Sequence, residues 1–253
     1  MGQPFVAVRE RFEPSPAFPP AWFPKGSEYR RIAGCRNQLN ICALAHYFQN
    51  SYSLPFIFLD HLCASAPEIM FRVPEDYIQG INRACLSAYS HDTHLLAYAF
   101  MSNHFHIVAE TANPDVYMGS IRNGYTKWFN NKYGRQGPLG YLSFHSVELT
   151  TADHILDGIT YVLRNGVHHN IAHYPSGYPY SSAKYYFMKD LGFQFKYSPV
   201  HTWKEQRKHL PWNTKLPSGF TLDKSGLLIQ EQILQSAMVE HYYGTARNGL
   251  NST

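Results

Sequence analysis

The stretch HLLAYAFMSNHFHIVAE, residues 94–110, decides the fold that the sequence predicts. Apolar residues fill its first half, the dipeptide Ser102-Asn103 interrupts them, and a second apolar run follows. Ser and Asn favour tight turns, and two apolar runs separated by two such residues are typical of paired antiparallel strands. We therefore expect a β-hairpin of 94–101 and 104–110 in the centre of a buried sheet.

The segments around this hairpin have a helical period or a strand-like alternation. Acidic residues open an amphipathic helix predicted over 75–89, and Asn113-Pro114-Asp115 opens a second helix that Gly134 ends. Residues 141–149 alternate as a strand does, and a capped helix is expected from 151 to about 165. This order of elements predicts an α+β fold with an antiparallel sheet and helices on one face.

The two ends of the chain differ in composition from this core. Six prolines within residues 1–27 forbid a helix and favour an extended, Pro-rich N-terminal arm. Residues 28–190 form the predicted central domain. Residues 191–253 are expected to be a C-terminal extension with one amphipathic helix, at about 229–243, that packs on the core or meets a partner.

The overall composition indicates a folded chain of mild charge. Lys and Arg number 22 and Asp and Glu number 18, which gives a net charge of +4, so a basic surface has to come from the placement of cations. Hydrophobic residues make up 44% of the chain, which excludes intrinsic disorder. No apolar run approaches about 18 residues, and no secretory signal is recognisable, so we expect a cytoplasmic protein without a membrane segment.

The sharpest local feature is the sequence His104-Phe105-His106 in the second strand of the hairpin. Residues two apart in a strand point to the same face, so both imidazoles can reach one divalent ion. Two histidines rarely complete a metal site. In a chain with 14 histidines, this spacing is also compatible with hydrogen-bonded or incidental imidazoles.

A second feature is the pair Tyr161 and Asn165 in the helix that begins near residue 151. Their spacing of four places them one turn apart on one helix face. The Asn165 amide oxygen could then join the two imidazoles as a third ligand, with the Tyr161 phenol over the same metal. A tyrosine at helical spacing is more simply a core residue with a satisfied hydroxyl.

These residues belong to a longer resemblance. Residues 98–108, YAFMSNHFHIV, resemble the vMPNHvHll strand of the single-tyrosine HUH transposases, in particular the REP-associated tyrosine transposases and their insertion-sequence relatives. Three further segments follow in the family's order. YTKWFNNKYGRQG (125–137) resembles its YtryFNrryGRsG motif. YVLRN (161–165) resembles YIhlNP, and YPYSS (178–182) resembles YPWSS. The separation of 57 residues between His104 and Tyr161 is also similar to the family's.

The resemblance implies a ferredoxin-like catalytic domain and a defined chemistry. His104, His106 and Asn165 would hold Mg²⁺ or Mn²⁺, and Tyr161 would be the nucleophile. The implied enzyme is a transposase-like, metal-dependent transesterase that cleaves and rejoins single-stranded DNA at hairpin-marked sites through a 5′-phosphotyrosine intermediate. Its implied partner is single-stranded or hairpin DNA, no membrane is involved, and a homodimer is possible. Its implied location is the bacterial cytoplasm, in association with the nucleoid.

The DNA-contacting residues are less well defined than the chemistry. Five cations are expected to contact DNA: Arg122, Lys127, Lys132, Arg135 and Arg164. Three histidines could support the site or contact phosphate, although each is more simply incidental: His145, His168 and His169. The sequence departs from the family where Ser102 replaces proline and where Gly-Val-His-His-Asn at 166–170 replaces Pro-Val-Arg-Ala-Gly, with loss of an arginine.

Two alternative functions remain open at this point. A host-adopted protein could bind DNA hairpins without cutting them, which the thinned basic residues favour, although such a protein needs no nucleophile. A metal phosphohydrolase could instead use the histidine pair and an activated water. Loss of Tyr161 separates the alternatives, because only the transesterase depends on it.

Overall fold

The computed structural model describes residues 8–9, 58–65, 68–141, 143–188, 190–210 and 214–244. The expected Pro-rich arm, apart from residues 8–9, and the beginning of the predicted central domain lie outside this part of the chain. The described residues include one sheet of five strands in the order β1-β5-β2-β4-β3. The strands are β1 (Val8–Arg9), β2 (Phe58–Ser65), β3 (His94–Phe100), β4 (His104–Thr111) and β5 (His145–Glu148).

The predicted hairpin is confirmed and forms one side of this sheet. β3 and β4 pair antiparallel, and the Met101 amide donates to the His104 carbonyl at 2.8 Å to close the turn. β4 also pairs antiparallel with β2, and β2 with β5, while β1 runs parallel to β5. β2 and β3 therefore flank β4 in the split β-α-β arrangement. A helix at Pro74–Ser90 (α2) connects β2 to β3, and a helix at Pro114–Tyr133 (α3) follows β4. The order β2-α2-β3-β4-α3-β5 is that of a ferredoxin-like α+β fold.

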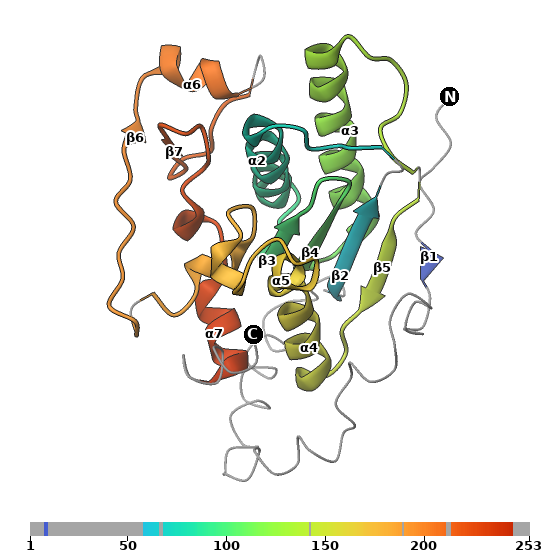
Figure 1. Cartoon of the computed structure of the whole chain (residues 1–253), viewed down its shortest axis with the longest axis vertical. Coiled ribbons are helices and arrows are strands. Elements are labelled where there is room, and N and C mark those ends of the chain that lie inside the picture. Colours follow the sequence, from blue (N-terminus) through green and yellow to red (C-terminus); the bar gives the residue numbers. More distant parts are fainter. Residues whose placement is uncertain are drawn as a thin grey trace, which may run out of the picture. The chain divides into compact units, whose positions relative to one another are not determined.

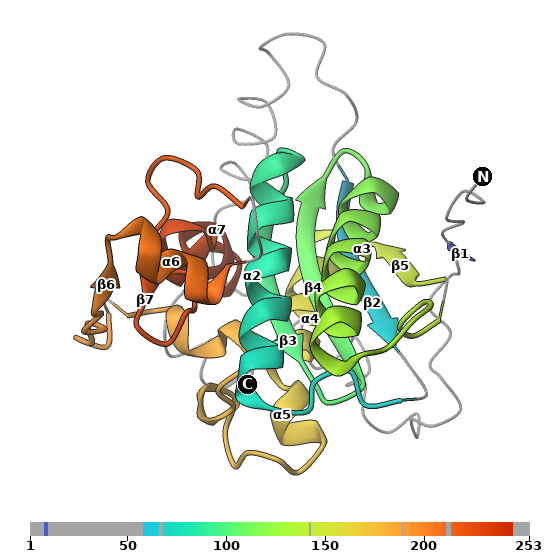
Figure 2. The same cartoon turned by 90° about the horizontal axis from the view of Figure 1, so that it is seen from above.

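The two helices of this unit begin and end close to where the sequence predicts. α2 (Pro74–Ser90) starts where the backbone amides of Arg72 and Val73 donate to the Asp76 carboxylate, at 2.7 and 3.1 Å. α3 (Pro114–Tyr133) starts where Asn113 accepts from the Val116 amide, and it ends at Gly134, whose φ of 61° is left-handed. Both helices pack on the same face of the sheet and lie side by side (Figure 2).

Helices cover the other face as well, which the prediction of helices on one face did not include. Along β4, Phe105, Ile107 and Ala109 belong to the core beneath α2 and α3, whereas Val108 packs with α4 (Ala152–Leu163) and α7 (Ser236–Tyr243). The apolar run of β3 is buried on both faces, as strands covered on both sides require. Figure 1 shows the strands between α2 and α3 above and α4 below.

The C-terminal extension packs back on this core. It contains a two-stranded pair of β6 (Pro199–Val200) and β7 (Leu222–Asp223), together with α6 (Trp203–His209), η5 (Gln230–Gln232) and α7. The expected single helix at 229–243 is thus split into a short 3₁₀ turn and α7, and α6 is a second α-helix. The apolar stripe is nevertheless buried, because Ile229, Ile233 and Val239 all lie in the interior.

Two buried polar contacts fix the extension to the sheet and to α2. Gln230 accepts from the Tyr98 hydroxyl at 3.0 Å, and Asn82 of α2 bonds the backbone of Gly226 and Leu228 at 2.7 and 2.9 Å. Among the described residues, no helix is long and apolar enough to cross a membrane.

Candidate active site

The two histidines of β4 lie on the face of the sheet that α4 covers. Strand alternation turns His104 and His106 away from the aromatic core, and their ring centroids are 5.1 Å apart. His106 is buried and His104 is half-buried. The prediction that both imidazoles share one face is consistent with this geometry.

Tyr161 reaches the histidines from α4. Thr151 caps this helix by accepting from the His154 amide, and Ile159, Val162 and Leu163 bury its apolar side. The same packing leaves Tyr161 half-buried at the edge of the core, with its ring perpendicular to that of His106 and 5.4 Å away between centroids. A helix residue and a strand residue separated by more than fifty positions are thus brought into contact.

Asn165 completes the group from the first position of the short helix α5 (Asn165–His168). Its side chain is 1% exposed, and its Nδ2 makes a long contact of 3.5 Å to the Tyr161 carbonyl. Its Oδ1 is buried, has no hydrogen-bond partner of good geometry within the described part of the chain, and faces the His104 side chain. Buried acceptors are nearly always satisfied, so this oxygen is available to a ligand of the site.

The residues present fit a divalent ion through this amide oxygen. In the described residues no group of three His, Cys, Asp or Glu side chains is arranged to hold a metal. A site here therefore depends on His104, His106 and the Asn165 oxygen together. Imidazole nitrogen and amide oxygen are both common ligands of divalent metals.

A third imidazole, that of His169, also lies at the site. Its ring centroid is 5.3 Å from that of His104 and 5.3 Å from that of His168. Burial and the neighbouring His169 lower the pKa of His104, and the facing Asn165 side chain opposes this shift. Burial and His168 lower the pKa of His169 as well. His104 is therefore mainly neutral at pH 7, the form that ligates metals.

The residue pattern gave only a weak signal for His169. It follows Asn165 by four positions, which is one helical turn, and it stands where the resembling family has alanine. His145, by contrast, lies on β5, beyond β2 from the β4 histidines.

Four of the five predicted DNA-contacting cations lie away from Tyr161. Arg122, Lys127 and Lys132 belong to α3, on the opposite face of the sheet, and Arg135 follows that helix. Arg164 differs, because it is exposed and directly precedes Asn165.

Two of these cations, Lys132 and Arg135, form ion pairs within the protein. Lys132 Nζ lies 2.7 Å from Glu75 and 2.7 Å from Asp76, and Arg135 lies 2.5 Å from Glu68. Lys127 is exposed. The structure thus gives Lys132 and Arg135 a structural role, and their contact with DNA stays a prediction.

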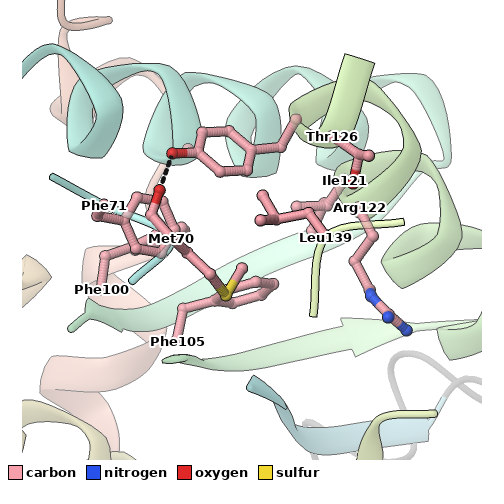
Figure 3. A pocket seen from close by; sticks show the side chains of 10 residues that line it. Met70, Phe71, Phe100, Phe105, Ile121, Arg122, Thr126 and Leu139 are labelled. Carbon is pink, nitrogen blue, oxygen red and sulfur yellow. Dashed lines mark hydrogen bonds between the residues drawn. The ribbon is translucent and has the colours of Figure 1, made fainter. Parts of the chain in front are cut away.

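Arg122 lines a small cavity between α3, the hairpin and the loop before α2 (Figure 3). The cavity measures about 10 Å³, about the space of one water molecule, and its walls are mainly apolar. Tyr125 donates to the Met70 carbonyl at 2.7 Å across it, and the Arg122 guanidinium extends away from the aromatic rings. Burial lowers the pKa of Arg122. This cavity is too small for a substrate.

Comparison with known proteins adds a structural likeness. No family model matches the chain. No curated protein matches it either. A solved structure of a REP-associated tyrosine transposase bound to a REP hairpin is similar over 67% of this chain and 92% of its own, at 13% identity and a TM-score of 0.42. A likeness of this size assigns neither a family nor an activity.

Proposed function

We propose that this chain is a metal-dependent DNA strand transferase with Tyr161 as its nucleophile. The observation that carries the proposal is the ring contact between Tyr161 and His106, whose partner His104 lies on the same face, with the buried Asn165 oxygen beside them. The four sequence motifs in transposase order support the same assignment.

His104, His106 and Asn165 would hold the divalent ion. The ion would be Mg²⁺ or Mn²⁺, both of which accept a carbonyl oxygen such as that of Asn165. When bound, the ion would polarise the scissile phosphate and favour the phenolate of Tyr161. The lowered pKa of His104 serves this role, because a neutral imidazole binds metal without first losing a proton.

The reaction we propose exchanges one phosphodiester for another. Tyr161 Oη attacks phosphorus, the bond from phosphorus to the 3′ oxygen breaks, and the 3′ oxygen takes up the proton that the phenol loses. The products are a 5′-phosphotyrosine and a free 3′ hydroxyl. Because the number of phosphoester bonds is unchanged, a second 3′ hydroxyl can reverse the step and join strands without ATP.

A single strand with a hairpin is the substrate that we propose, on the basis of the motif resemblance. Arg164 is the candidate phosphate contact nearest the nucleophile, since it is exposed and adjacent to Asn165. His169 lies beside His104 and offers a further ring N–H to a phosphate oxygen.

Trapping of a protein–DNA adduct tests this function. The purified chain is incubated with end-labelled hairpin-bearing single strands in Mn²⁺ or Mg²⁺, and the products are separated on a denaturing gel. We expect a slow protein-linked band that disappears in Tyr161→Phe and persists in Tyr141→Phe, a control in which an exposed tyrosine outside the site is changed. Binding without an adduct in either protein would indicate a non-cleaving hairpin binder. Cleavage that persists in Tyr161→Phe would indicate a phosphohydrolase that uses water.

A further inference from the structure

The helix α6 of the C-terminal extension carries an exposed indole among cations. Trp203, its first residue, is 50% exposed, although tryptophan is a residue that proteins usually bury. The Arg207 guanidinium lies 5.7 Å from the centre of its ring. Lys204 and Lys208 are exposed on the adjoining side of the helix.

A groove runs beside this helix. It has a volume of about 490 Å³ and lies between α6 and the segment at 215–220. Its walls combine aromatic, apolar and basic side chains: Trp203, Gln206, Lys215, Leu216, Pro217 and Phe220. Lys215 places a further exposed cation on the side of the groove that faces α6.

The charge of this surface favours a polyanion. On α6 the cations Lys204, Arg207 and Lys208 stand against one acid, Glu205. That acid is engaged at the start of the helix, where its carboxylate accepts from the Thr202 hydroxyl at 2.7 Å. An indole beside a row of cations is the combination that lets proteins hold single strands, because bases stack on the ring and phosphates meet the charges.

The surface is preformed and lies away from the candidate active site. Gln79 of α2 donates a hydrogen bond to the His209 carbonyl at the end of α6, and Leu210 is buried in the core. Figure 1 shows α6 at the top and α4, the helix to which Tyr161 belongs, at the bottom. A strand held on α6 would therefore be bound at a place separate from the nucleophile.

We propose that Trp203, Lys204, Arg207, Lys208 and Lys215 form a second binding surface for single-stranded DNA. A base stacks on Trp203, and the flanking phosphates contact the four cations. The surface tethers the strand on which Tyr161 acts, so the identity of the polyanion as DNA rests on the proposed function. Base stacking and phosphate contact are separable properties of this surface, and each has its own variant.

Binding of two fluorescent strands to the whole protein, with chelator present, tests the stacking. One strand is an oligothymidine of about 20 nucleotides, and the other has the same phosphates with abasic sugars. We expect Trp203→Ala to weaken binding of oligothymidine about 5- to 150-fold and to leave the abasic strand unchanged, while Trp203→Phe restores most of the affinity. Phe193→Ala, at an even more exposed aromatic of the same extension, is the control and should change neither.

The triple variant Lys204→Gln, Arg207→Gln, Lys208→Gln tests the phosphate contacts. It should weaken both strands and reduce the slope of log affinity against log salt by about 2, since each lost contact with a single strand removes about 0.7. Lys196→Gln, an exposed lysine elsewhere in the extension, should leave the slope unchanged.

Three results would overturn the surface assignment: equal affinities of parent and Trp203→Ala for oligothymidine, an equal loss with the abasic strand, or much tighter binding of the corresponding RNA. The adduct assay separates this inference from the proposed function. A tyrosine adduct with unchanged α6 variants refutes the second surface alone. The α6 effects without any adduct refute the strand-transfer function alone.

Discussion

Gly166→Ala probes how α5 holds Asn165 beneath the tyrosine. A Cβ at this position would lie 2.6 Å from Tyr178 Cβ and 2.8 Å from Tyr178 Cγ, against ordinary contacts of 3.4–4 Å. Tyr178 has little freedom to move, since it is buried and its hydroxyl donates to the Phe100 carbonyl at 2.7 Å. The backbone of α5 must therefore shift, together with Asn165.

The expected cost follows from this overlap. Overpacking of a well-filled interior costs about 1–3 kcal/mol. In a chain of this size each kcal/mol changes the melting temperature by about 2–4 °C, so Gly166→Ala should melt roughly 2–12 °C below the parent. Thermal unfolding followed by circular dichroism measures the shift. We also expect adduct formation to fall in the folded variant, because Asn165 is displaced.

Gly119→Ala is the matched control within α3. Its added Cβ would meet no atom within 4 Å, and alanine is favoured over glycine inside a helix by about 0.5–1 kcal/mol. Its melting temperature should rise by roughly 1–4 °C. Equal melting temperatures for the two variants, or a rise in both, would refute the argued clash with Tyr178.

Three further predictions concern the side chains of Asp76, His94 and Asn165. Asp76→Ala removes the buried acceptor at the start of α2 and should lower the free energy of unfolding by about 3 kcal/mol or more, measured by denaturant titration. Its control is Glu75→Ala, at the largely exposed neighbouring carboxylate, which should cost under about 0.5 kcal/mol. The hydrogen bond to Glu110 raises the pKa of half-exposed His94, so the charged imidazole stabilises the fold below pH about 6.5. His94→Gln should therefore lower the free energy of unfolding by about 0.5 kcal/mol or less in that range, and less at high salt. Once the pH has risen through the folded pKa, the variant and the parent should be equally stable. Asn165→Leu should raise the stability of the chelated protein by about 1 kcal/mol and abolish the melting-temperature rise that Mn²⁺ gives the parent; a variant that keeps that rise would exclude Asn165 as a ligand.

Local signals account for the parts of the fold that the sequence predicted well. The hairpin, α2 and α3 were foreseen within a few residues, because turn residues, a capping Asn113 and the left-handed Gly134 act on their own neighbours. The strand β2 (Phe58–Ser65) carries no comparable local signal. Its sequence FLDHLCAS lacks regular alternation, and it is a strand because β4 and β5 bond it from both sides.

The end of α4 shows the same limit. The helix was expected to run from 151 to about 165, yet α4 ends at Leu163 and the chain continues through α5, which contains Gly166. Glycine ends a helix where the backbone turns left-handed, but here it is needed for space, because Tyr178 from a later loop packs against it. The contact with Tyr178 thus requires a glycine at a position where the local sequence alone would suggest the end of a helix. The expected strand at 141–149 was likewise shortened to the four residues of β5 that pair with β2.

The geometry of the candidate site likewise depends partly on local spacing and partly on tertiary contacts. The spacing of His104 and His106, and of Tyr161 and Asn165, is readable in the sequence, because each pair lies within one element. The approach of His106 to Tyr161 depends on α4 covering the second face of the sheet, which the residue pattern did not predict.

The placement of the cations has a consequence for how DNA could reach the tyrosine. Lys132 and Arg135 are engaged in ion pairs with carboxylates, and the sheet separates α3 from α4. A strand at Tyr161 therefore cannot contact these residues at the same point, and Arg164 is the one of the five predicted cations that adjoins Tyr161. A single nearby cation gives weak and weakly salt-dependent binding. Among the described residues, α6 offers candidates for further phosphate contacts, because it carries a row of exposed cations beside an exposed indole.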